Sequence, residues 1–131
     1  MSQKKYRELL DEKRVWYKAV KKSYCPILKE DVIFNSKGFH HLLFDGLGHP
    51  RVTKERMYRV GLLPLVIPVL KAATAVHEYV PRAYSKSLNK MVEYWILKET
   101  VGKQKTWITL VLRRIGSGNI TFYSVWKKET R

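Results

Sequence analysis

Apolar and polar positions follow two different periods along the chain, and the period changes near residue 76. Residues 3–22 place apolar side chains at helical spacing, with lysines and arginines at many of the remaining positions. The apolar stripe consists of Tyr6, Leu9, Leu10, Trp16, Tyr17 and Val20. This pattern predicts that residues 1–22 contain an amphipathic N-terminal helix that packs on the core.

Pro26 indicates where this helix has ended, because proline cannot continue a helix and restricts the residue before it. Residues 23–28 are therefore expected to form an exit loop. Two short β-prone runs follow at residues 32–34 and 39–44, separated by the turn signal Ser36-Lys37-Gly38. These runs are expected to form either a small hairpin or one kinked strand.

The next part of the chain combines a glycine-containing loop with helical structure. Residues 45–50 are expected to be the loop, and Thr53 is a good N-cap for the helix that follows. Pro64 and Pro68 each remove a backbone donor. Residues 54–74 are therefore predicted to form one kinked helix or two short ones.

From residue 76 onward the pattern is typical of β-strands. Four strands are expected at residues 76–80, 91–98, 106–115 and 120–127, joined as an antiparallel meander. The order predicts an α+β fold, with N-terminal helices packed on one face of a roughly four-stranded antiparallel sheet. At 131 residues, the chain (1–131) is expected to form a single domain.

The hairpin around residues 116–119 decides which side chains share a face of the sheet. A loop of two or four residues gives one register, and a loop of three or five would reverse the faces of one strand. The even loop pairs Ile115 with Ile120, Arg113 with Phe122, Val111 with Ser124 and Thr109 with Trp126. One face is then mostly aliphatic and should pack on the helices: Ile108, Leu110, Leu112, Tyr123 and Val125. The other carries Trp107, Thr109, Arg113, Phe122, Ser124 and Trp126.

The strand at residues 91–98 can be registered so that a carboxylate stays out of the core. In that register Glu93 lies beside Thr109, Arg113 and Ser124 on the second face. The aliphatic face then gains Val92, Tyr94 and Ile96.

The charge balance suggests what the second face binds. Lys and Arg number 26 against 11 Asp and Glu, giving a formal net charge of +15 that is spread along the chain. Such a surface attracts polyanions, so nucleic acid, and RNA in particular, is the expected partner. Aromatic, hydroxyl and arginine side chains on one face suit base stacking and phosphate binding, although the same pattern also fits a semi-buried rim. The candidate binding side chains are Trp107, Thr109, Arg113, Trp126 and Lys127.

His40 and His41 are the best-placed acid/base groups in this carboxylate-poor chain. In an extended strand they would point to opposite sides, so one is expected to be catalytic and the other structural. A histidine pKa of about 6.5 suits either proton-transfer role, and Glu93 is the one carboxylate expected as a base. The histidines lack metal-ligand spacing and the carboxylates do not cluster, so no metal or cofactor is expected. RNA cleavage would then need a base, an acid and a cation.

Cysteine usage and hydropathy indicate the cellular compartment in which the protein is expected. Cys25 is the only cysteine, so no intrachain disulfide or cysteine-based zinc site is expected, which fits a reducing cytosol. The most apolar run, residues 60–70, contains two prolines and is shorter than the ~20 residues that span a bilayer. The basic N-terminus lacks a signal-peptide pattern. A soluble cytoplasmic protein with no membrane partner is expected.

Five short motifs occur in order: Cys-Pro-Ile-Leu (25–28), Val-Ile-Phe-Asn (32–35), Gly-Phe-His-His-Leu (38–42), Tyr-Arg (58–59) and Ile-Thr-Phe-Tyr-Ser-Val-Trp (120–126). Over residues 24–128 this order resembles the phage-associated branch of the barnase, EndoU, colicin and RelE-like nuclease superfamily. The resemblance implies an α+β domain with a four-stranded antiparallel sheet, and metal-independent RNA cleavage through a 2′,3′-cyclic phosphate. It also implies use as a toxin or mobile-element effector, with an acidic antitoxin or immunity protein as a further candidate partner.

The resemblance implies a catalytic site of His41, Arg59 and Ser124, and the adjacent His40 leaves open which ring is used. Two other functions stay open. The same charge and aromatics would suit a non-catalytic nucleic-acid-binding module, and a basic protein that binds an acidic protein is the third.

Overall fold

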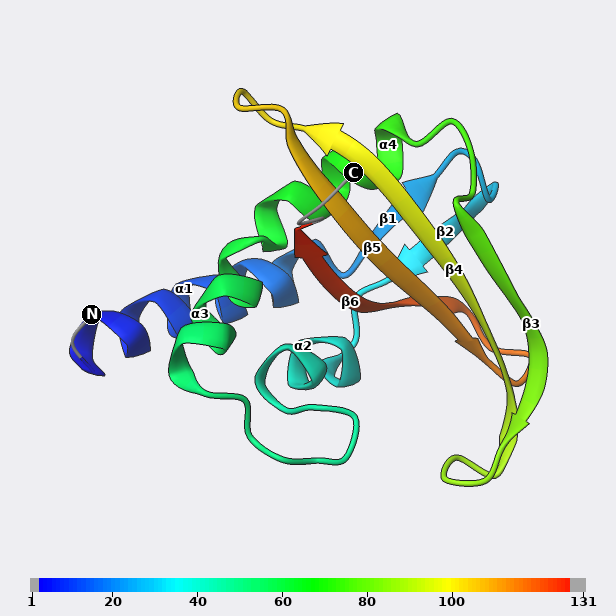
Figure 1. The fold of residues 1–131 in the computed structure, drawn as a ribbon, viewed down its shortest axis with the longest axis horizontal. Coiled ribbons are helices and arrows are strands. Elements are labelled where there is room, and N and C mark those ends of the chain that lie inside the picture. Colours follow the sequence, from blue (N-terminus) through cyan, green and yellow to red (C-terminus); the bar gives the residue numbers. More distant parts are fainter. Residues whose placement is uncertain (1–2, 128–131) are drawn as a thin grey trace.

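The structure is a computed structural model that describes residues 3–127, in which helices pack around one mixed sheet (Figure 1). The helices are α1 (Gln3–Val20), α2 (Ser36–Leu43), α3 (Thr53–Gly61), the 3-10 helix η1 (Leu63–Leu65) and α4 (Val66–Ala72). The strands are β1 (Lys22–Cys25), β2 (Glu30–Ile33), β3 (Glu78–Ser85), β4 (Lys90–Val101), β5 (Thr106–Ile115) and β6 (Ile120–Lys127). The α+β class is confirmed.

The sheet has six strands in the order β1-β2-β6-β5-β4-β3, so the expectation of a four-stranded antiparallel sheet is wrong in extent. The meander β3–β6 is antiparallel, as predicted. The additional strands form the β1–β2 hairpin, and β2 pairs in parallel with β6 at Val32–Ile120 and Ile33–Thr121. Pro26 begins the four-residue turn of this hairpin, which leaves residues 22–25, predicted as loop for the most part, free to pair as a strand.

Helix α1 confirms the predicted N-terminal helix and buries two members of its apolar stripe, Tyr6 and Tyr17. The Tyr17 hydroxyl donates to the backbone carbonyl of Asn35 at 2.6 Å. Its ring meets those of Phe34, Phe39 and Phe122 edge-on at centroid distances of 5.2–6.1 Å. Burial raises the pKa of the Tyr17 hydroxyl. This aromatic cluster fixes α1 against the start of α2 and against β6.

Helix α2 replaces the second β-run, so the predicted strand at residues 39–44 is wrong. Asn35 caps the helix, because its side-chain oxygen accepts a hydrogen bond from the Gly38 N–H at 3.1 Å. The apolar residues Phe39, Leu42 and Leu43 have helical spacing and are buried on one side. The capping and burial of this segment outweigh its β-prone composition.

Gly38 has a different function from the predicted turn, because it allows α2 to lie directly on β6. A Cβ at this position would be 2.5 Å from the carbonyl oxygen of Phe122 and 2.6 Å from the Tyr17 hydroxyl. Only glycine fits so close an approach. The side chains of α2 are therefore held against β6.

The proline-rich segment forms α3, η1 and α4, which confirms the prediction of short helices. Thr53 is the first residue of α3, and Val52 is its N-cap without a side-chain hydrogen bond, so the predicted cap is one residue out. Pro64 lies in η1, between α3 and α4. Within residues 3–127, no helix is both long enough and apolar enough to cross a bilayer.

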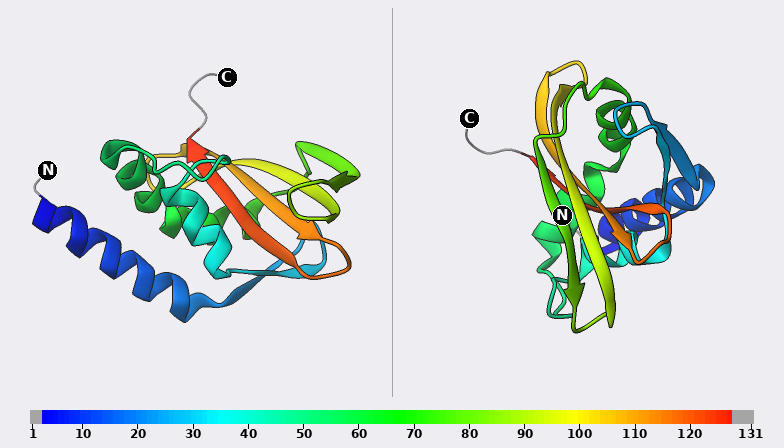
Figure 2. Two further views of the ribbon diagram at one scale, coloured as in Figure 1. Left: turned by 90° about the horizontal axis from the view of Figure 1, so that it is seen from below. Right: turned by 90° about the vertical axis from the view of Figure 1, so that its right-hand side faces the viewer.

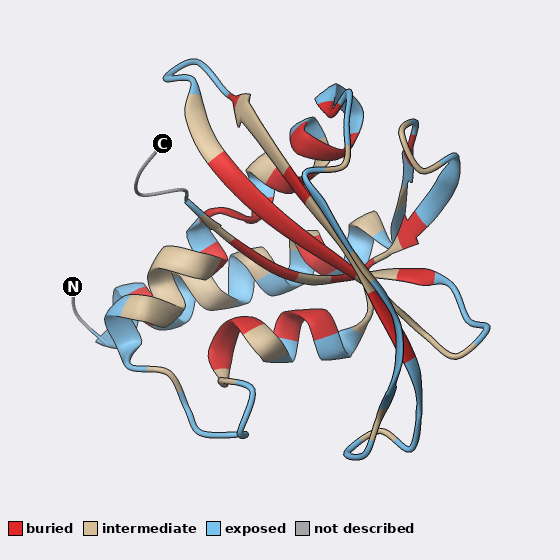
Figure 3. Ribbon diagram, turned by 45° about the vertical axis from the view of Figure 1, so that its right-hand side comes forward, coloured by how far each residue is buried: buried red, intermediate tan, exposed pale blue. Residues whose placement is uncertain are grey.

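The core lies between the long strands and the elements on one side of them. The right-hand view in Figure 2 shows α4 and the β1–β2 hairpin on the same side of these strands, and α4 packs on both β4 and β1. Buried residues run along β5 and along α2 and α4 (Figure 3). Cys25 is fully buried at the end of β1, and burial raises the pKa of its thiol.

A β-bulge in the last hairpin changes which side chains of β6 face the core. Thr109–Trp126 and Val111–Ser124 pair as predicted, but the next pair is Leu112–Phe122, so Tyr123 is an extra residue on β6. Phe122 is consequently buried in the core, and Tyr123 is only partly buried. The predicted pairs Arg113–Phe122 and Ile115–Ile120, and the faces assigned to Phe122 and Tyr123, are wrong for this reason.

The predicted face of β4 is also reversed. Glu93 pairs with Arg114, Tyr94 with Arg113 and Trp95 with Leu112, so Glu93 and Trp95 share the core-facing side. The predicted register keeps Glu93 out of the core, but this carboxylate is only 7% exposed and has partners that compensate its burial. It accepts hydrogen bonds from Tyr79 and Arg114, which offset the cost of burying its charge.

Candidate active site

His41 reaches the edge of the sheet because β6 lacks a neighbouring strand there. Strand β2 pairs with β6 only as far as Thr121, and α2 packs against β6. The His41 ring stacks on Tyr123 with a centroid distance of 4.3 Å and an interplanar angle of 23°. Consecutive residues of a helix diverge by about 100°, so His40 points elsewhere.

Arg51 lies in the loop after α2 and contacts His41. Asp45 orders this loop by accepting hydrogen bonds from the Leu47 and His49 N–H groups at 2.9 and 3.0 Å. The Arg51 Nε–H donates to the carbonyl oxygen of His41 at 3.1 Å, and Nη2 lies 3.5 Å from the His41 Nε2. One guanidinium group therefore contacts both the backbone and the ring of His41.

Arg59 reaches the same region from α3. Its Nη1 donates to the Ser124 hydroxyl at 2.9 Å, and its Nε donates to Glu55 at 2.8 Å. The guanidinium also lies 5.8 Å from the centre of the Trp126 ring. Ser124 is only 2% exposed, so its hydroxyl orients Arg59 instead of contacting a ligand directly.

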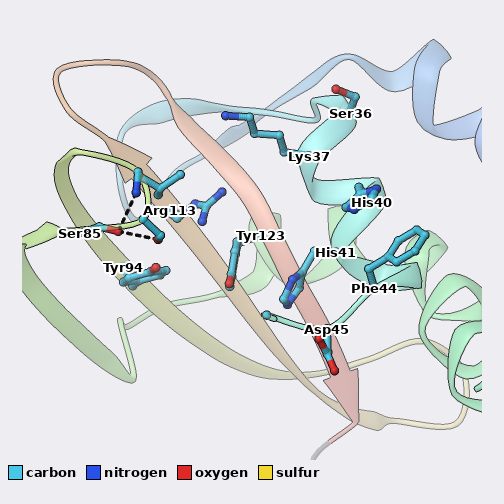
Figure 4. A pocket seen from close by; sticks show the side chains of 13 residues that line it. Ser36, Lys37, His40, His41, Phe44, Asp45, Ser85, Tyr94, Arg113 and Tyr123 are labelled. Carbon is cyan, nitrogen blue, oxygen red and sulfur yellow. Dashed lines mark hydrogen bonds between the residues drawn. The ribbon is translucent and has the colours of Figure 1, made fainter. Parts of the chain in front are cut away.

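Arg113 completes the arginine cluster from β5. Its guanidinium carbon lies 4.3 Å from the centre of the Tyr123 ring, and Figure 4 shows Tyr123 between Arg113 and His41. No carboxylate within residues 3–127 forms an ion pair with Arg113, and its buried Nε has no hydrogen-bond partner there. This cation is available to an anionic ligand.

The surroundings of His41 favour the neutral imidazole. Burial, followed by the charges of Arg51, Arg59 and Arg113, lowers the pKa of His41 to about 4. Asp45 acts in the opposite direction but more weakly. At neutral pH the ring is therefore an uncharged proton acceptor next to three cations.

A cavity of about 480 Å³ opens beside this cluster (Figure 4). Helix α2 forms one wall with His40, His41 and Lys37, and Tyr94, Arg113 and Tyr123 line the sheet side. The end of β3 contributes Ser85, and the turn that follows contributes Ser87 and Leu88. The cavity thus joins acid/base, cationic and aromatic groups, which is the combination expected for binding a nucleotide phosphate and base.

Several of the residues predicted for the site do lie together. They form two contact groups: His41 and Arg113 both contact Tyr123, whereas Ser124 and Trp126 both contact Arg59. The groups are linked by charge, because Arg59 lowers the pKa of His41. His40 is exposed, stacks on Phe44 at 4.2 Å and also lines the cavity.

Other predicted residues lie elsewhere or are covered. Glu93, expected beside Arg113, is on the other face with Arg114, so the register on which its catalytic assignment depended is wrong. Trp107 is six residues from Arg113 along β5, about 20 Å in a strand, and lines a different cavity with His77 and Lys98. Thr109 is 2% exposed. Lys127 is exposed at the end of β6, next to Trp126.

Arg51, Tyr94 and Tyr123 are site residues that the sequence did not predict. The sequence predicts both tyrosines on the aliphatic face, but their rings meet edge-on at 5.6 Å, and Tyr123 contacts both Arg113 and His41. Arg51 follows a Gly/Pro loop. It lies ten residues after His41 in the sequence, and no local pattern joins the two residues.

Within the described part of the chain, no three His, Cys, Asp or Glu side chains are grouped so that they could hold a metal ion. Comparison of the chain with protein-family models, curated proteins and solved structures gave no match. The resemblance to the nuclease superfamily stays a prediction.

Proposed function

We propose that this protein is a metal-independent endoribonuclease that cleaves RNA through a 2′,3′-cyclic phosphate. The observation that carries the proposal is the environment of His41, a neutral ring stacked on Tyr123 and close to Arg51. Arg59 and Arg113 add two further cations, and the chain as a whole carries a formal net charge of +15. These groups are what in-line attack by a ribose 2′-hydroxyl requires.

His41 is the general base of the proposed reaction. It takes the proton of the 2′-hydroxyl, whose oxygen then attacks the adjacent phosphorus and expels the 5′-oxygen of the next nucleotide. The negative charge of the bound phosphate opposes the effect of the arginines on His41, which raises the pKa of the ring as substrate binds. The base therefore becomes stronger in the complex than in the free protein.

Arg113, which lines the cavity, binds and neutralises the phosphate, whose charge increases in the transition state, and Arg51 adds positive charge next to the His41 ring. Arg59 is held by Glu55 and Ser124 and adds to the same positive field. The leaving oxygen needs a proton donor, and His40 is the candidate because it lines the same cavity as His41. The products are a 2′,3′-cyclic phosphate and a free 5′-hydroxyl.

A nucleic-acid-binding module without turnover is the second candidate. The pairs Arg113–Tyr123 and Arg59–Trp126 favour it, since arginine–aromatic surfaces bind single strands without chemistry. In that case His41 would contribute to binding alone.

Incubation of the purified protein with end-labelled RNA, tRNA included, in the presence of EDTA tests the proposal. We expect fragments with cyclic phosphate ends, and a loss of about 10²- to 10⁴-fold in kcat/KM for His41→Gln. RNA affinity should be nearly unchanged in that variant. His77→Gln is the matched control, because this exposed histidine precedes β3 and lines a different cavity.

Absence of cleavage of every RNA, with affinity intact, would favour the binding module. Equal activity of the His41→Gln and His77→Gln variants would remove His41 from the reaction.

A further inference from the structure

A second cavity, of about 380 Å³, lies on the other side of α2 from His41. Its lining combines rings with two cations of α1. The rings belong to Tyr17, Phe34, Phe39, His40 and Phe44, and the cations are Arg14 and Lys18. The Arg14 guanidinium lies 4.9 Å from the centre of the Phe39 ring. No acidic residue among residues 3–127 lines this cavity.

Helix α2 separates the two cavities. Ser36, His40 and the C-cap residue Phe44 line both of them. Ser36 and His40 are one helical turn apart, and the Phe44 ring stacks on His40, so the three form one line. Side chains on either side of this line diverge, so that His41 faces the first cavity and Phe39 the second. The separation is a single helix, about 10 Å across with its side chains.

We propose that the second cavity binds a nucleobase of the same single-stranded RNA whose phosphate is bound beside His41, with the strand crossing the Ser36–His40–Phe44 line. The inference rests on the proposed function. Unpaired bases are recognised by insertion among aromatic side chains, whereas a base in a duplex must first be unpaired and unstacked, at a cost in free energy. The strand that fits both cavities is therefore single.

The polar groups of the cavity agree with this occupant. Arg14 and Lys18 are exposed on α1 at its rim, where they suit the phosphates that flank an inserted base. The Tyr17 hydroxyl already donates to the Asn35 carbonyl oxygen. Ser36 is then a polar side chain able to contact the edge of the base.

The test uses 2′-O-methyl oligonucleotides of two to six residues, which lack the attacking hydroxyl and measure binding alone. We expect affinity for the wild-type protein to increase about tenfold at the length that reaches the second cavity. The double variant Arg14→Ala/Lys18→Ala should lose this increase and keep its affinity for the dinucleotide. The control Lys4→Ala/Arg7→Ala removes the same charge from exposed positions of α1 that do not line the cavity.

A second arm separates base binding from phosphate binding. An oligonucleotide with one abasic residue, placed in turn at each position, should lose the tenfold increase at one position only. A full increase with every abasic substrate, or equal losses in the two double variants at all lengths, would overturn the inference. Failure of the proposed function would be seen separately, as inertness of unmodified RNA with the length-dependent binding retained.

Discussion

Arg113 and Arg114 are neighbours on β5, yet their guanidinium groups have opposite surroundings. Arg114 forms ion pairs with Glu30 at 2.5 Å and with Glu93 at 3.3 Å, which connect β5 to β2 and β4. Arg113 has no carboxylate partner among the described residues and lies over Tyr123, on the side that carries His41. Successive side chains of a strand point to opposite faces, so one residue step separates these environments.

The comparison teaches that residue type alone does not assign an arginine to function. The charge of Arg114 is neutralised within the fold, where its removal would leave a buried carboxylate without a cation. The charge of Arg113 can bind a ligand. Without a ligand it lowers the pKa of His41. The same substitution at the two positions should therefore have separate consequences.

Among the changes that test this comparison, Arg113→Gln should have the largest effect, and it should act on catalysis. Removing one preorganised cation from a developing phosphorane should lower kcat/KM for RNA cleavage by about 10²- to 10³-fold. The melting temperature should change little, because no ion pair of the fold is lost. Steady-state kinetics and thermal unfolding of one preparation measure kcat/KM and the melting temperature. Wild-type activity of the Arg113→Gln protein would contradict the assignment of Arg113 to phosphate binding.

Arg114→Gln should have the reverse effect. The free energy of unfolding should fall by about 2–4 kcal/mol, because Glu93 loses its cation while it stays buried. Below the melting temperature of the variant, cleavage should continue at close to the wild-type rate. Urea denaturation, followed by tryptophan fluorescence, measures the free energy of unfolding. Unaltered stability together with lost cleavage would show that Arg114 serves catalysis and does not stabilise the fold.

A smaller effect is expected for Ser124→Ala, which removes the hydroxyl that accepts from Arg59. A hydrogen bond to a charged group contributes about 1.5–3 kcal/mol, and Glu55 still holds the guanidinium, so kcat should fall about tenfold. Ser124→Thr keeps a hydroxyl and should restore most of the rate. The exposed Ser117→Ala is the control. An unchanged kcat in Ser124→Ala would show that Arg59 needs no such support.

The smallest effect concerns stability against pH. The folded protein holds the pKa of His41 at about 4, below its ordinary 6.5, so between these values the unfolded chain binds a proton that the native state does not. Stability should therefore fall on acidification from pH 6.5 to 4, by about 1 kcal/mol at a partly solvated site. His41→Gln should lessen this dependence in urea titrations at pH 7 and pH 5. Parallel losses in both proteins would contradict the low pKa.

The sequence predicted the α1 stripe, the proline-broken helices and the antiparallel meander because each depends on local periodicity. It failed at α2, where Phe39 to Phe44 is β-prone in composition. The segment is helical because Asn35 caps it and because Gly38 allows it to lie directly on β6. The second of these is a tertiary contact between segments more than 80 residues apart, which periodicity does not contain.

The candidate site was predicted in part. His41 and Arg113 meet at Tyr123, Arg59 contacts Ser124, and the charge of Arg59 acts on His41. Tyr123 could not be predicted, because a bulge of one residue in β6 re-aims it and leaves no periodic trace. Glu93 was misplaced because its compensating partners come from β3 and β5. Partners across the sheet therefore decide which charges stay available.

The measurement that tests the central claim most directly uses a DNA oligonucleotide with a single ribonucleotide, incubated with the protein in EDTA. If His41 activates a ribose 2′-hydroxyl, the strand should be cut once, on the 3′ side of that ribonucleotide, and the new end should be a 2′,3′-cyclic phosphate. His41→Gln should leave the strand intact, whereas His77→Gln should cut it. Cleavage at deoxynucleotides, or no cleavage by a protein that binds the strand, would contradict the account.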